Sequence, residues 1–151
     1  MQETMGSADI KSEAKAASID SEWPEFREWY ALSMEEERLY NVEPTPTNLD
    51  EQLDKIDAVR GPLQAAMVAR QPRGIVQSAI LSMIALRWSE RVKSDHGVYR
   101  SFELGYQSAF SNGHAAEFAL TEGVVRLALQ HDLLPGIVVY DKTGAASSSA
   151  A

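Results

Sequence analysis

Apolar residues recur along most of the chain at steps of three and four, the spacing of one face of an α-helix. Within this pattern Gly61-Pro62 predicts a kink or a break, because proline removes an amide donor and crowds the preceding turn. The segment 73–94 is apolar on nearly all sides, which is typical of a helix surrounded by others. The pattern predicts helices over residues 22–40, 48–60, 62–70, 73–94, 98–111 and 114–132.

The two ends of the chain have a different character. Residues 1–20 are small and polar, with few large apolar side chains to offset the entropy of ordering, and predict a flexible acidic arm. Residues 137–141 are β-branched and strand-like, without an obvious partner strand, and a low-complexity tail follows. We therefore expect an all-α bundle of four to six helices over residues 21–136, followed by an extended strand and disordered tail over 137–151.

Composition narrows the classes of chemistry. The 151 residues suit one domain, and the lack of cysteine excludes disulfides, thiolate metal sites and thiol nucleophiles. The most apolar stretch, residues 75–86, is interrupted by polar side chains and is shorter than the roughly 20 residues that span a bilayer. With no apolar run typical of a signal peptide near the N-terminus, we expect a cytoplasmic protein without membrane contact and without a cofactor.

Charge is distributed unevenly along the chain. Residues 1–57 carry fifteen acidic and five basic side chains, net −10, whereas residues 58–151 carry seven and nine, net +2. The bases concentrate further over residues 60–100. Fields of this kind steer association, so the asymmetry favours a contact surface rather than a reaction.

Several residues could form such a surface. An aromatic cluster precedes the acidic run Glu35-Glu36-Glu37, which we expect to point outward, and the strand at 137–141 could augment a sheet of another chain. We therefore predict a non-enzymatic interaction subunit or adaptor of a larger assembly, binding a protein partner or a second copy of itself. Ordinary core packing is the alternative for the aromatic residues. The candidate interaction residues are Trp23, Phe26, Trp29, Tyr30, Arg87, Arg91, Ile137 and Val139.

A competing hypothesis rests on carboxylates. Glu25 and Glu28 share one helix face and Glu51 and Asp54 share another, and four converging carboxylates could hold magnesium. The spacing resembles the ExxE and ExxD elements of the all-α nucleoside triphosphate pyrophosphohydrolases. That resemblance implies a small metal-dependent nucleotide hydrolase with these four residues as metal ligands. The commoner explanation of such a cluster is a solvated acidic face.

Two further patterns were weighed. His131-Asp132 resembles the paired ligands of the HD phosphohydrolases, with His96 or His114 as the upstream histidine, but the distant downstream aspartate of that family has no match. A histidine that ends a helix is the simpler interpretation of His131. Direct nucleic-acid binding by the basic segment is disfavoured by the net charge of −8. The acidic N-terminal third could instead occupy the basic groove of a nucleic-acid-binding protein and inhibit it.

Overall fold

The computed structural model describes residues 21–87, 99–104, 112–141 and 146–148. This part of the chain is predominantly helical, as expected, but it also contains a three-stranded sheet that an all-α bundle lacks. The elements are α2 (Phe26–Asn41), α3 (Leu49–Val68), α4 (Ile75–Arg87), β1 (Glu103–Leu104), α5 (Asn112–Gln130), β2 (Val138–Asp141) and β3 (Ala146–Ser148).

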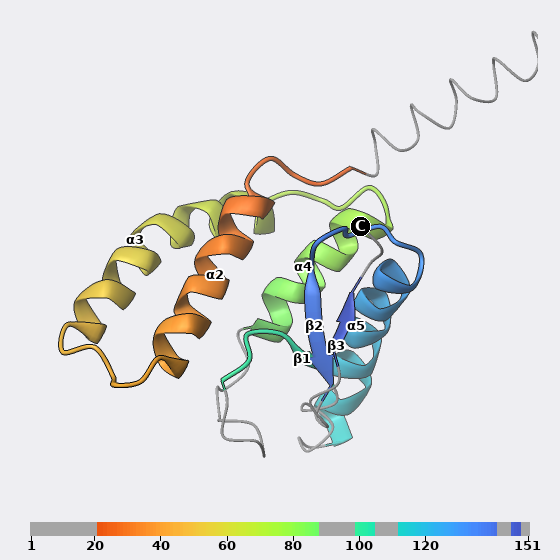
Figure 1. The fold of residues 1–151 in the computed structure, drawn as a ribbon. Coiled ribbons are helices and arrows are strands. Elements are labelled where there is room, and N and C mark those ends of the chain that lie inside the picture. The colour runs from red at the N-terminus through yellow and green to blue at the C-terminus, as the bar shows by residue number, and fades with distance from the viewer. Residues whose placement is uncertain (1–20, 88–98, 105–111, 142–145, 149–151) are drawn as a thin grey trace, which may run out of the picture.

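The helices α2 and α3 form an antiparallel hairpin on one side of the molecule, α4 lies in the middle, and the sheet and α5 complete the other side (Figure 1). Residues 42–47, which contain Pro44 and Pro46 between the predicted helices 22–40 and 48–60, separate α2 from α3. The central position expected for segment 73–94 is confirmed for its described part, since α4 packs against both α3 and α5. One continuous core results, and its largest fully buried side chains are Trp29, Phe26, Phe102, Met67, Ile80 and Met83.

Of the kink or break expected near Arg60, the break is wrong, because α3 runs without interruption through Pro62. Proline at this position removes the hydrogen bond that the carbonyl of Ala58 would accept. Ala58, Gly61 and Pro62 are all exposed, so solvent can reach that carbonyl. The apolar periodicity on the inner side then keeps α3 in one piece against α2.

The sheet overturns two expectations. Residues 99–104 do not belong to a helix, because they lead into β1, which pairs in parallel with β2 in the register Glu103 to Tyr140. The strand at 137–141 does not lack a partner, because β2 is the central strand and also pairs antiparallel with β3. The helix α5 is the crossover that joins the two parallel strands, as parallel pairing requires. The remainder of the expected helix, residues 105–111, lies outside the described residues.

The chain leaves α5 through local signals that position β2. Asp132 adopts a left-handed conformation with φ of 56°, the N–H of Leu133 donates to the carbonyl of Ala128, and the N–H of Asp132 donates to that of Leu129. These bonds form a Schellman motif with aspartate where glycine is commoner. Pro135 and Gly136 (φ 78°) then make a turn closed by the N–H of Ile137. The turn directs β2 back into the core.

Candidate functional site

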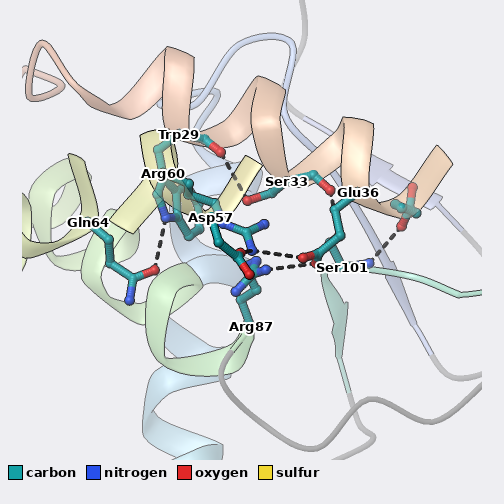
Figure 2. A network of polar contacts seen from close by, with 9 residues as sticks. Trp29, Ser33, Glu36, Asp57, Arg60, Gln64, Arg87 and Ser101 are labelled. Atoms are coloured by element: carbon teal, nitrogen blue, oxygen red, sulfur yellow. Dashed lines mark hydrogen bonds and ion pairs between the residues drawn. The ribbon is translucent and has the colours of Figure 1, made fainter. Parts of the chain in front are cut away.

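A cluster of charged side chains lies at the centre of the molecule, where α2, α3 and α4 meet (Figure 2). One carboxylate oxygen of Glu36 accepts a 2.8 Å hydrogen bond from Arg60, and the other accepts a 2.7 Å bond from Arg87. Arg60 also donates to Asp57 at 2.7 Å. Because Glu36, Arg60 and Arg87 are all buried, the cluster ties three helices together away from water.

Helical period explains why this carboxylate is buried. Trp29, Ser33 and Glu36 follow one another at steps of four and three, and all three lie on the inner face of α2. Glu35, one position earlier, points outward and pairs with Arg38 at 2.6 Å. The expectation that the whole acidic run points outward is therefore wrong for Glu36.

This ion cluster can hold the helices in place, but its arginines cannot take part in proton transfer. Two guanidinium groups balance two carboxylates, and arginine does not give up its proton in proteins, so the arginines cannot serve as proton-transfer groups. Nη1 of Arg60 is buried and has no hydrogen-bond partner among the described residues. We therefore interpret Glu36, Arg60 and Arg87 as a device that fixes the relative positions of α2, α3 and α4.

The same face of α2 also anchors the segment that leads into β1. The side-chain amide of Asn41 donates to the carbonyl of Tyr99 and accepts from its N–H, at 2.9 and 2.8 Å. Ser101 donates its N–H to Glu37 at 2.6 Å and its hydroxyl to the carbonyl of Ser33 at 3.0 Å. Polar side chains of one helix thus hold a strand that is distant in sequence.

The four carboxylates proposed as metal ligands do not converge. The pair Glu25 and Glu28 lies at the start of α2 and the pair Glu51 and Asp54 at the start of α3, so the antiparallel hairpin places the pairs at opposite ends. Among the described residues no group of three acidic or histidine side chains could hold a metal ion. The magnesium hypothesis is therefore wrong for these four residues.

The aromatic residues expected at a contact surface belong to the core. Trp23, Phe26 and Trp29 are buried and Tyr30 is partly buried. Phe26 stacks on Trp29 with ring centroids 6.1 Å apart, and Phe102 lies 5.7 Å from Trp29. These aromatic residues therefore pack in the core, which was the alternative to a contact surface.

The other candidate interaction residues are also placed away from solvent where the structure describes them. Arg87 belongs to the ion cluster around Glu36, and Ile137 and Val139 are fully buried. Arg91 lies outside the described residues. The proposed free strand is therefore corrected, because it pairs inside the fold. Within the basic segment Arg60 and Arg87 are buried, whereas Arg70 and Arg73 are exposed.

The uneven charge of the chain is partly neutralised within the molecule. The acidic helix α2 meets bases of the following segment at Glu36, described above, and at Glu25, which binds both terminal nitrogens of Arg70 at 2.6 and 2.5 Å. These hydrogen bonds from Arg70 lower the pKa of Glu25 below its ordinary value of 4.5. The opposite charges of the two segments thus serve contacts between helices of one chain.

The Glu25 carboxylate gives an acid-sensitive contribution to stability. Because the folded state lowers its pKa, the contribution is present above the ordinary pKa and is lost as the pH falls through the folded value. We expect the stability difference between wild type and Glu25→Gln to shrink from about pH 5 to about pH 3 in urea unfolding. Arg70→Gln should show the same pH dependence as Glu25→Gln. A difference that stays constant over this range would contradict the assignment.

A cavity of about 600 Å³ opens between α5 and the sheet. Leu104 and Leu129 form its apolar part, and Arg126, Gln130 and Ser147 contribute polar groups. In the described part of its lining no carboxylate or imidazole is present that could act as a general base. We therefore assign no reaction to this cavity.

The outer side of α5 exposes apolar side chains. Leu120 is 72% exposed and Leu127 is 47% exposed, and they lie seven residues apart on one face of the helix. Ala116 precedes Leu120 by four residues, Gly123 follows Leu120 by three, and Leu127 follows Gly123 by four. We call these four residues the α5 stripe. The helix α5 itself lies at one side of the drawn fold (Figure 1).

The sequence pattern of α5 does not separate the α5 stripe from the core. The predicted helix 114–132 is confirmed by α5, but the apolar residues of this helix fall into two sets on different faces. Val125, Ala128 and Leu129 are buried, whereas the stripe is offset from them around the helix. The sequence signal for the exposed set is the width of the apolar arc around this helix, which is too wide for one buried face.

Comparison of the chain with protein-family models, with curated proteins and with solved structures found no match. None of the described helices combines the length and apolar character needed to cross a membrane.

Proposed function

We propose that this protein is a non-enzymatic interaction subunit or adaptor of a larger assembly, and that it docks through the α5 stripe. The supporting observation is the exposure of Leu120, a large aliphatic side chain at the centre of α5, together with that of Leu127 on the same face. The surface differs from the aromatic and basic one expected from the sequence, of which Trp23, Trp29 and Arg87 are buried.

The stripe differs from ordinary scattered exposure. Single exposed apolar residues are normal on protein surfaces, whereas a contiguous apolar patch marks an interaction site. Leu120 and Leu127 are one heptad apart, with Gly123 between them, so a partner helix could contact all of them along one line. Full burial of a leucine contributes about 1.5–3 kcal/mol, so two leucines offer a substantial part of a docking energy.

Site-specific photo-cross-linking tests this proposal. A diazirine-bearing aliphatic residue is placed at position 127 of the full chain, expressed in the organism it comes from. Position 59 on α3 is the matched control, because Val59 is 46% exposed and Leu127 is 47% exposed. We expect position 127 to give one discrete cross-linked species and position 59 to give none of that species. Equal, diffuse labelling from both positions would contradict the proposal.

A further inference from the structure

We infer that the partner of the α5 stripe is a second copy of this chain, with the two α5 helices packed antiparallel. This inference rests on the proposed function, because it names the occupant of the same surface. It depends on three observations, which concern the spacing of the stripe, its glycine and the dipole of α5.

The spacing of the α5 stripe is complementary to itself when reversed. The steps of four, three and four between Ala116, Leu120, Gly123 and Leu127 are the same in both directions. An antiparallel pair therefore brings Leu127 of each copy opposite Ala116 of the other, and Leu120 opposite Gly123. Each layer then joins one large and one small side chain, which is how helices interdigitate without voids. In a parallel pair leucine would face leucine and glycine would face glycine, leaving a gap at Gly123.

Gly123 is not explained by packing within the chain. A glycine inside a helix costs about 1 kcal/mol relative to alanine, and close approach of another element is the usual compensation. A Cβ built on Gly123 would meet nothing within 4 Å. The close approach that this glycine permits is therefore not used by the described part of its own chain, whereas Leu120 of a second copy would use it.

The dipole of α5 also favours the antiparallel arrangement. Antiparallel pairing aligns opposite helix dipoles, whereas parallel pairing would bring like helix ends together. The charges of Glu122 and Arg126 do not oppose either arrangement, because these residues form an i,i+4 pair within α5. The contact is a single helix pair, so we expect weak association at the low end of interface size.

Sedimentation velocity over a concentration series of the full chain provides the first test. We expect a reversible monomer–dimer equilibrium for wild type, and at least a tenfold weaker dimer for Leu120→Asp. Val68→Asp is the control, because Val68 is a similarly exposed aliphatic residue on α3, and it should dimerise like wild type. A wild-type chain that stays monomeric at all concentrations would overturn the inference.

Gly123→Ala separates pairing from folding. The added methyl group has open space in the monomer, so the melting temperature measured at low concentration should rise or stay constant. The same methyl group occupies the position that Leu120 of the second copy needs, so dimerisation should weaken at least tenfold. If Gly123→Ala dimerises as strongly as wild type, the antiparallel register is wrong.

Disulfide trapping tests the orientation, because the chain has no cysteine of its own. Equal amounts of Ala116→Cys and Leu127→Cys protein, distinguished by a mass tag, are mixed and oxidised. Antiparallel pairing predicts mainly the mixed disulfide, whereas parallel pairing predicts mainly the two homodimers, which would overturn the inference.

Cross-linking at position 127 distinguishes docking through the α5 stripe from pairing of α5 with a second copy of the chain. A product at twice the mass of the chain, containing only its peptides, supports both. A product with a different protein sustains the proposed function and overturns self-pairing. A product within one chain, for example with residues 1–20, overturns both.

Discussion

Replacing Glu36 by alanine should lower the free energy of unfolding by about 3–5 kcal/mol, the cost of leaving buried charges without their partner. Glu36 is the only carboxylate in the described structure that contacts both Arg60 and Arg87. Removing it leaves Arg87 without that carboxylate and leaves Arg60 only its bond to the exposed Asp57. Urea unfolding followed by circular dichroism measures the change.

A matched control lies one residue away. Glu35 forms a surface pair with Arg38, and Glu35→Ala should change stability by no more than about 1 kcal/mol. Apolar replacement of the whole cluster, Glu36→Leu with Arg60→Met and Arg87→Met, should recover most or all of the lost stability, since burial of the charges is itself costly. If Glu36→Ala and Glu35→Ala destabilise equally, the ion cluster does not hold the three helices together.

Replacing Trp29 by alanine should also destabilise the fold, by about 3–5 kcal/mol, because it opens a large cavity in the core. Trp29 is fully buried, packs between Phe26 and Phe102, and donates its indole N–H to Gln64 at 3.1 Å. Thermal unfolding monitored by far-ultraviolet circular dichroism measures the loss, which should be accompanied by a clear fall in melting temperature.

This variant also decides between two interpretations of the aromatic cluster. A residue that served a contact surface would lower the affinity for a partner and leave the monomer as stable as before. Glu28→Ala, an exposed change one position earlier in α2, is the control and should alter stability by no more than about 0.5 kcal/mol. Unchanged stability of Trp29→Ala would restore the surface interpretation.

The helices could be predicted from the sequence because their signal is local. Steps of three and four identified α2, α3, α4 and α5, and the prolines of residues 42–47 marked the turn of the hairpin. The sheet was missed for the opposite reason. β1 is two residues long, and its aromatic neighbours Tyr99 and Phe102 fall at a helical step. Its partner strand β2 follows α5 in the sequence, and no local pattern reveals a pairing between segments so far apart along the chain.

The candidate site was predictable only in part. Charge segregation favoured a contact surface for a partner, but a sequence does not specify whether opposite charges meet within one chain or between two. The meeting of Glu36 with Arg60 and Arg87 shows that one such contact is internal. Exposure of Leu120 was indicated only by the width of the apolar arc on the predicted helix, because a single apolar residue at helical spacing has the same pattern whether it faces a core or a partner.

The central place of β2 in the sheet has a consequence for biosynthesis. Ile137 and Val139 fill the core beside side chains such as Phe102, which the ribosome delivers much earlier. While the residues up to the Pro135-Gly136 turn have emerged and β2 is still in the exit tunnel, Phe102 and its neighbours have no cover from that strand. A nascent chain stalled at this point should bind chaperones more strongly than one released after residue 141 has cleared the tunnel.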